Sequence, residues 1–347
     1  MKKLIIASFS SLLTLMAFTS LVLIHCAGMG VNLAEDFDPA NLTTVHKKII
    51  GVSGGTGFIA PPAISPEMNQ KLTVSMGGAE LHLQSLDESD KRTVYAAGGG
   101  GVISPNIIDI SWSPDGNWVA LLVYRPSSTD ASYLLMDTES FETRTLLEFS
   151  PPYAESGSSE QQSENVVYNC GVSWKSNDTV LLSAFLQNAE NYELVELNIF
   201  SGDRAVIQEN DAVKAYFSPD GEKVAFFRPG GEYEGSWYSS QSSLESYFKT
   251  LDLYIGDADF SDAEKLAEGI HENKRVSWSR DGRYLAFVQD GKKSITGTSN
   301  TLKYYDTTGN TVKEIGTAKF LNAPAFSADN EIYFFVSSNF TYKAKIQ

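Results

Sequence analysis

The sequence predicts an all-β protein, a six-bladed β-propeller with four-stranded antiparallel blades and a ring closed by an N-terminal strand. Three observations lead to this prediction. A short motif, an aromatic residue followed by Ser-Pro-Asp-Gly, recurs along the 347-residue chain. A run of apolar residues follows the motif. Successive copies start 48, 62, 43, 61 and 48 residues apart, and repeats of this size are typical of propeller blades.

The first residue of each copy is called its anchor below. The motif is clearest in residues 112–116 and 217–221, and a worn copy occupies residues 278–282. Three further copies are more eroded, so that the six anchors in chain order are Ile64, Trp112, Trp174, Phe217, Trp278 and Phe326.

Each motif is a tight turn between two strands. Pro fixes φ near the value needed at the second position of the turn, Asp bonds to nearby backbone, and Gly adopts the left-handed conformation that closes the turn. The next strand is apolar throughout, as expected for a strand covered on both faces. These second strands are expected at residues 118–123, 223–227, 284–288 and 332–336.

Each repeat continues with a third and a fourth strand, which gives the four strands of a propeller blade. The expected pairs are 133–137 with 143–147, 193–197 with 204–207, 253–255 with 264–266, and 302–305 with 312–315.

The last repeat is incomplete, because only residues 340–347 follow its second strand. A strand-like segment at residues 43–50 precedes the first repeat. We expect it to supply the outer strand of the last blade, which would close the ring and cover exposed strand edges. Residues 43–347 are therefore expected to form a single propeller domain, joined to the N-terminal segment by a tether over residues 27–42.

Residues 1–26 have the features of a targeting segment: two lysines, an uncharged and mostly apolar stretch over residues 4–24, and Cys26. The segment resembles a bacterial lipoprotein signal, which implies a lipid on Cys26. His25 precedes that cysteine, and an uncleaved anchor or ordinary secretion are the alternatives. All three predict an exported protein, in the periplasm or anchored to a membrane.

The formal charge of −16 disfavours nucleic acid and anionic membrane as direct partners. Cys170 is alone if Cys26 carries lipid, so we expect a small buried side chain rather than a catalytic thiol. We expect no cofactor and no metal, because the acidic pairs lack the remaining ligands of a calcium loop. We also expect a monomer.

The repeated motif and its apolar strand resemble the TolB-type propeller repeat, also called a WD-like repeat, from Ile64 to the C-terminus. This repeat occurs in exported binding proteins and in the propellers of prolyl-oligopeptidase-type enzymes. The resemblance implies the fold and leaves the function open.

Long connections are expected on only one rim, at residues 51–62, 96–106, 150–166, 228–249 and 290–301. Insertions confined to one face usually mark a binding face. The aromatic and arginine residues in or beside these connections are candidate binding residues. They are Arg125, Tyr153, Arg228, Tyr233, Trp237, Tyr238 and Tyr247.

These observations favour a non-catalytic propeller that binds a protein or a cell-envelope component through its loop-rich rim. The alternative is a hydrolase or lyase that acts on a peptide or saccharide in the propeller funnel. An enzyme needs an acid and a base within reach of one substrate atom, and we identify no catalytic residues from the sequence.

Overall fold

The computed structural model describes most of the chain from residue 31 onward. The described residues are 31–346 without 48–59, 61, 68, 76–77, 88, 99–104, 126–129, 150–170, 185–192, 208–211, 233–248, 271–274, 292, 295–296, 320, 328 and 337–339. No helix in these ranges is long and apolar enough to cross a membrane.

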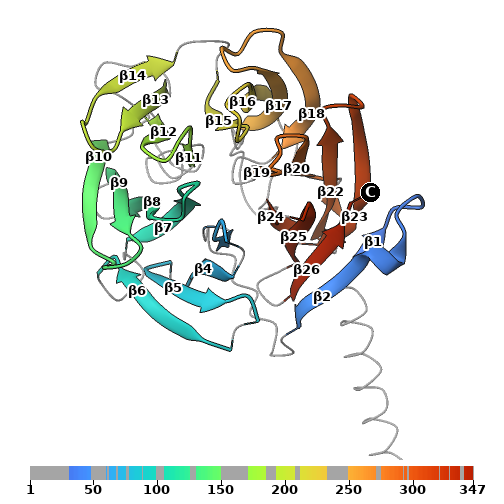
Figure 1. Cartoon of the computed structure of the whole chain (residues 1–347), viewed down its shortest axis with the longest axis horizontal. Helices are drawn as coiled ribbons and strands as arrows, with labels where there is room; N and C mark the ends of the chain where they lie inside the picture. Colours follow the sequence, from blue (N-terminus) through green and yellow to red (C-terminus); the bar gives the residue numbers. More distant parts are fainter. Residues whose placement is uncertain are drawn as a thin grey trace, which may run out of the picture.

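The described residues form six antiparallel sheets arranged as the blades of a ring. Figure 1 shows the blades following one another in chain order around a central axis. The first strand of each repeat lies nearest the axis, and the later strands lie further out. The predicted six-bladed propeller is confirmed.

Blades 1 to 3 each contain four strands in sequential order. Blade 1 consists of β3 (Ala63–Ile64), β4 (Gln70–Val74), β5 (Glu80–Ser85) and β6 (Lys91–Ala96). Blade 2 consists of β7 (Asn106–Trp112), β8 (Trp118–Arg125), β9 (Asp130–Asp137) and β10 (Thr143–Phe149). Blade 3 consists of β11 (Val172–Trp174), β12 (Thr179–Ala184), β13 (Glu193–Asn198) and β14 (Arg204–Ile207).

Blades 4 to 6 follow the same plan, with additions in blade 5. Blade 4 consists of β15 (Lys214–Phe217), β16 (Lys223–Glu232), β17 (Lys249–Asp257) and β18 (Glu264–Ile270). Blade 5 contains β19 (Val276–Trp278), β20 (Tyr284–Gln289), β21 (Lys293–Ser294), β22 (Gly297–Asp306), β23 (Thr311–Lys319) and β1 (Asn32–Leu33). Blade 6 consists of β24 (Leu321–Phe326), β25 (Glu331–Val336), β26 (Phe340–Lys345) and β2 (Leu42–Lys47).

The ring closes as the sequence predicts. β2 pairs antiparallel with β26, with Leu42 opposite Ala344 and Thr44 opposite Tyr342. The last blade therefore takes its outer strand from the beginning of the described chain and its other three strands from the end. Strand pairing between the two ends of the domain covers the edge that β26 would otherwise expose.

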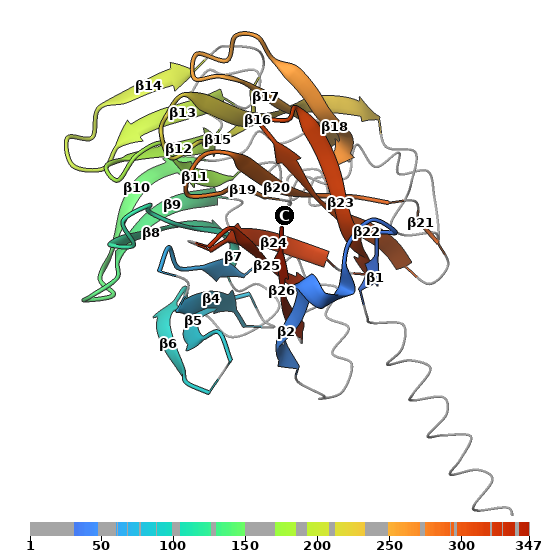
Figure 2. The same cartoon turned by 45° about the vertical axis from the view of Figure 1, so that its right-hand side comes forward.

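Residues 31–42 differ from the tether expected over residues 27–42. β1 adds to the edge of β23, with Leu33 opposite Gly316 (Figure 2). Asp38 then caps the short 3-10 helix η1 (Pro39–Asn41), which leads into β2. The close approach depends on Gly316, because a Cβ there would lie 2.5 Å from the carbonyl oxygen of Asn32. Val31 and Phe37 also pack against the core between blades 5 and 6.

Two connections expected as loops are partly strand. β16 and β17 continue beyond the predicted ends and pair as far as Glu232 and Lys249, past a bulge that begins at Pro229. In blade 5, β22 begins at Gly297, inside the connection expected at residues 290–301. Cross-strand hydrogen bonds continue there through residues whose Pro, Gly and polar composition predicts a loop.

Bonds between innermost strands join successive blades. The indole nitrogens of three anchors donate to carbonyl oxygens of the preceding blade: Trp112 to Ala63 at 3.2 Å, Trp174 to Ser111 at 3.1 Å, and Trp278 to Tyr216 at 2.8 Å. Phe217 and Phe326 have no indole donor. There the hydroxyl of Ser173 donates to the Ala215 carbonyl, and the Phe326 backbone donates to Ser277 Oγ at 3.2 Å. Hydrogen bonds at or beside the anchors thus join blades 1 to 6 in succession.

Candidate binding site at the centre of the ring

The two rims of the ring are defined by strand direction. Because neighbouring strands are antiparallel, the connections from first to second and from third to fourth strand lie on one rim. We call this the plain rim. The connections from second to third strand and from blade to blade lie on the other, the loop-rich rim, which receives both ends of the segments 48–59, 150–170 and 233–248.

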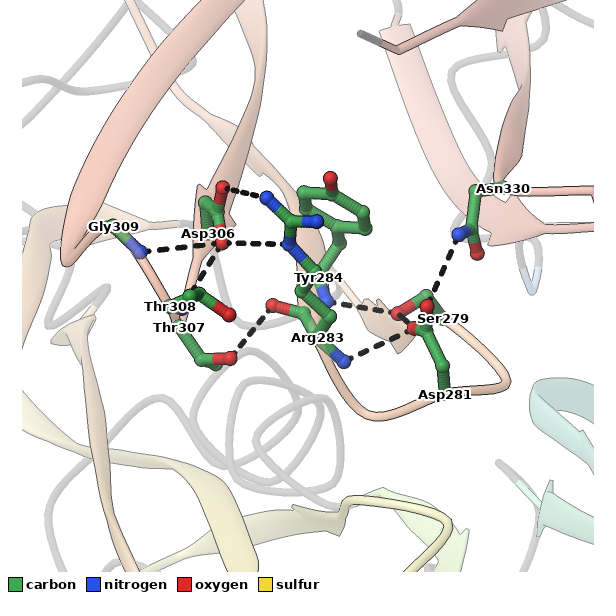
Figure 3. A network of polar contacts seen from close by, with 9 residues as sticks. All are labelled: Ser279, Asp281, Arg283, Tyr284, Asp306, Thr307, Thr308, Gly309 and Asn330. Carbon is green, nitrogen blue, oxygen red and sulfur yellow. Dashed lines mark hydrogen bonds and ion pairs between the residues drawn. The ribbon is translucent and has the colours of Figure 1, made fainter.

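On the plain rim, polar side chains bond within and between turns. Figure 3 shows this in blade 5. The hydroxyl of Ser279 donates to Asp281 at 2.6 Å and accepts from the Tyr284 backbone at 2.8 Å. Arg283 makes two bonds to the Asp306 carboxylate, at 3.1 and 2.9 Å. The predicted turn motif is thus held by hydrogen bonds between its own residues and to the strand that follows it.

These bonds stabilise the charged form of the turn carboxylates. The hydroxyl of Ser218 lowers the pKa of Asp220, and that of Ser279 lowers the pKa of Asp281. The Arg283 guanidinium lowers the pKa of Asp306. Asp281 also accepts from the Asn330 side chain at 3.2 Å, which links blades 5 and 6. Repeated Ser and Asp residues here shape turns, as the sequence predicts.

A different set of polar residues meets at the centre of the ring. Asp109 lies in β7 and is buried. Its carboxylate accepts from the Ile110 backbone at 3.0 Å, from the Val172 backbone of blade 3 at 2.9 Å, and from the guanidinium of Arg275. Arg275 directly precedes β19 of blade 5. Since blades 2 and 5 lie on opposite sides of the ring (Figure 1), this ion pair crosses the central axis.

Lys214 joins the same region from blade 4. It begins β15 and is 5% exposed. A Cβ at Gly171 would lie 2.8 Å from Lys214 Cε and 3.3 Å from an Asp109 carboxylate oxygen. The missing side chain at Gly171 therefore makes room for the lysine beside the aspartate. Blades 2, 4 and 5 thus contribute the charged layer of Asp109, Lys214 and Arg275, and blade 3 contributes the glycine beside it.

The charged layer occupies one position of the repeat. Asp109, Gly171, Lys214 and Arg275 each lie three residues before an anchor. Equivalent positions on the innermost strands have the same height along the axis, so residues far apart in sequence come together. The sequence interpretation missed this site, and aligning the repeats on their anchors would have revealed it.

The charged layer carries two positive groups and one negative group. The Nε atom of Arg275 is buried and has no hydrogen-bond partner among the described residues. Burial raises the pKa of the nearby Tyr216 hydroxyl, Asp109 adds to this rise, and Arg275 opposes it. In a protein of net charge −16, two cationic side chains therefore lie together near the axis, and one of them has a donor without a partner among the described residues.

Of the binding residues predicted from the sequence, Arg125 and Arg228 lie within the described part of the chain. Arg125 ends β8 and donates to the hydroxyl of Ser132 in β9. Burial raises the pKa of the Tyr95 hydroxyl, and the charge of Arg125 opposes that rise. Arg125 is thus placed at the loop-rich end of blade 2, facing blade 1.

Arg228 is not in a loop but in β16, opposite Asp252 of β17. Its guanidinium lies over the rings of Tyr254 and Phe226, 4.3 and 5.1 Å from their centres. The other predicted residues lie outside the described residues: Cys26, Tyr153, Tyr233, Trp237, Tyr238 and Tyr247.

In the ranges that the structure describes, no group of three or more His, Cys, Asp or Glu side chains is placed to hold a metal ion. The cationic members of the charged layer suit an anionic group instead, because arginine and lysine donate to carboxylate and phosphate oxygens.

No family model and no curated protein matches the sequence. The solved structures that resemble this chain include TolB from Acinetobacter baumannii, with 14% identity and a TM-score of 0.50 over 82% of this chain and 63% of TolB. The chain therefore spans less than two thirds of that protein's length.

Two further structures are similar at lower scores. They are oligogalacturonate lyase from Vibrio parahaemolyticus, with 10% identity and a TM-score of 0.45 over 82% of this chain and 76% of the other, and the β-propeller domain of the Trilobed protease from Pyrococcus furiosus, with 15% identity and a TM-score of 0.41 over 80% and 76%. At such identities the similarity to TolB shows the propeller fold alone.

Proposed function

We propose that this chain is an exported propeller that binds a protein or cell-envelope component through its loop-rich rim, with the charged layer at the base of the binding region. The observation that carries the proposal is Arg275, whose buried Nε has no partner in the described residues. Buried donors in native proteins are normally paired. A donor left over beside Lys214 is consistent with a bound partner that supplies the acceptor.

The distribution of long connections supports the same face. The three longest internal segments outside the described residues, 150–170, 233–248 and 48–59, join strand ends on the loop-rich rim. Connections of this length are commonly functional, and loops on a rigid scaffold commonly carry binding residues.

We favour binding over catalysis because of the state of Asp109. A hydrolase or lyase acting at the centre of the ring needs a base that is available to a substrate. The Asp109 carboxylate is held by two backbone N–H groups and by Arg275. This arrangement suits a structural and electrostatic role.

The test is crosslinking and recovery of partners from envelope extract. One variant replaces residues 233–248 with Asn-Gly, a two-residue turn that fits between the paired ends Glu232 and Lys249. A matched control alters the plain rim, with Glu139→Ala in an exposed turn. We expect the loop variant alone to lose partners. Equal recovery by both variants would contradict the proposal.

The anchoring of the protein is a separate proposal. We propose that residues 1–26 direct export and that Cys26 carries a lipid, which would place the propeller in the periplasm or at a membrane surface. The test is metabolic labelling with a fatty acid in the parent and in Cys26→Ala. Labelling that survives the substitution would exclude lipid attachment at this residue.

A further inference from the structure

Two more buried polar atoms have no hydrogen-bond partner among the described residues: Ser183 Oγ and Arg228 Nε. Ser183 follows Leu181 by two positions in β12, and Arg228 follows Phe226 by two positions in β16. Leu181 and Phe226 belong to one core cluster between blades 3 and 4. Because side chains alternate along a strand, Ser183 and Arg228 both face this interface, one step closer to the loop-rich rim.

Arg228 is held in a fixed orientation. Its guanidinium lies over Tyr254 and Phe226, and these two rings stack on each other with centres 5.7 Å apart. A cation over aromatic faces is attracted without using its N–H groups. The side chain is therefore positioned by packing while its hydrogen-bonding capacity is kept.

The carboxylate opposite Arg228 on the neighbouring strand bonds to other residues. Asp252 is its cross-strand neighbour, but that carboxylate accepts from the Gly269 backbone at 3.1 Å and lies 3.3 Å from Lys265 Nζ. Both partners belong to the outer strand β18. The Asp252 carboxylate is thus bonded to the outer strand of the blade.

Ser183 is placed beside the charged layer. It is 1% exposed, and its backbone N–H donates to the Gly171 carbonyl at 3.1 Å. Lys214 passes next to the same glycine, where a Cβ would lie 2.8 Å from its Cε. The interface between blades 3 and 4 therefore presents a buried hydroxyl, a buried guanidinium N–H and a nearby lysine.

Leaving buried donors unpaired costs stability. A carboxylate matches this set, because its oxygens accept the two N–H groups along one edge of a guanidinium and a further hydroxyl proton. We propose that the rimward end of the interface between blades 3 and 4 is a subsite for a carboxylate carried by the polypeptide partner. This inference rests on the proposed function and gives that partner an acidic side chain or C-terminus.

The experiment reads the arginine Nε–H groups directly. The chain has eight arginines, so protein labelled with ¹⁵N-arginine gives a spectrum of few signals, in which Arg228→Lys identifies the signal of Arg228. The probe is N-acetylglutamate amide, and its neutral isostere N-acetylglutamine amide is the control ligand. We expect the glutamate probe alone to shift the Arg228 signal.

Ser183→Ala keeps the charge and removes the hydroxyl. Because Ser183 Oγ has no partner in the described residues, this variant should fold as stably as the parent, and it should bind the probe about fivefold more weakly. Arg204→Lys, in an exposed strand position, is the matched control and should leave probe binding unchanged.

The inference fails if the Arg228 signal does not move, if the glutamine probe moves it equally, or if inorganic phosphate moves it as strongly at lower concentration. The last result would identify a general anion site. Failure of the proposed function is distinguishable: a shift with the glutamate probe, without loss of partners from the variant lacking residues 233–248, would keep the subsite and reject the rim.

Discussion

The plain rim and the loop-rich rim use polar side chains in opposite ways. On the plain rim, Ser and Asp residues bond one another within each turn, as in the pairs Ser113–Asp115, Ser218–Asp220 and Ser279–Asp281. Toward the loop-rich rim lie all the buried side-chain atoms that have no partner in the described residues: Ser183 Oγ, Arg228 Nε and Arg275 Nε. The polar side chains of the plain rim thus pair with one another, whereas those toward the loop-rich rim include buried atoms without a partner in the described residues.

A turn sequence that satisfies its own hydrogen bonds folds locally and can be repeated in every blade. An unpaired buried donor lowers the stability of the folded protein, so buried donors in native proteins are normally paired. The difference between the two rims is therefore the observation on which the proposed binding face depends.

The largest effect is expected at the centre of the ring. Asp109→Ala removes the acceptor of Arg275 and of the Val172 backbone. It leaves the buried guanidinium uncompensated, so we expect a loss of about 3–5 kcal/mol in the free energy of unfolding. Denaturant unfolding measures it. The exposed pair Lys223–Asp257 is the control, and Lys223→Ala should cost less than about 1 kcal/mol. Similar losses would remove the distinction.

A smaller effect is expected for the bonds between blades. Trp278→Phe removes the indole donor to the Tyr216 carbonyl and should lower the free energy of unfolding by about 1–2 kcal/mol. Trp118→Phe is the matched control. Trp118 also packs against the core between two blades and contacts the Phe200 ring, but its indole nitrogen makes no hydrogen bond among the described residues. Thermal unfolding of both variants separates the hydrogen bond from the change in ring size, and equal losses would show that the bond contributes nothing.

The plain rim should be sensitive to acid. The folded pKa values of Asp281 and Asp306 lie below the ordinary value of 3.8. Their contribution to stability is therefore present above that value and is lost as pH falls toward the lowered values. Ser279→Ala removes the largest cause at Asp281, so it should destabilise more at pH 7 than at about pH 3. Urea unfolding at both pH values measures the difference. A loss independent of pH would place the whole effect in the Tyr284 backbone bond.

The smallest effect is expected at Phe200. Its residue surface is 68% exposed in the turn between β13 and β14 on the plain rim. Phe200→Ser removes the ring contact with Trp118 and should lower the free energy of unfolding by about 0.5–1 kcal/mol, and partner recovery should be unchanged. Lost recovery would show that the plain rim also takes part in binding.

The fold was predictable because its signals are local. Pro and Gly in Ser-Pro-Asp-Gly determine a turn, and the apolar run after it determines a strand buried on both faces. Ring closure was also predictable, because the last repeat lacks one strand and residues 43–50 supply one. The strand position of Arg228 was not, since Pro229, Gly230 and Gly231 predict a strand end and only pairing with β17 extends it.

The candidate site was predictable only in part. The loop-rich rim as a binding face stays a prediction, and it depends on sorting the connections by length. The charged layer required comparison across repeats, because Asp109, Lys214 and Arg275 lie in three different blades and none forms a local motif. The sequence around each of them predicts only a charged residue within or next to a strand. Only their common distance from the anchors places them at one height on the axis.

The pairing of β2 with β26 has a consequence for the order of folding. Leu42 of β2 lies opposite Ala344 of β26. Pairing of these strands therefore closes a loop that includes nearly the whole domain. Individual blades can form from residues close together in the sequence, but the ring is completed only when β26 pairs with β2. Contacts of such sequence separation slow folding. In blade 6, β26 lies between β25 and β2. Loss of β26 would therefore expose the edges of both these strands and leave the ring open.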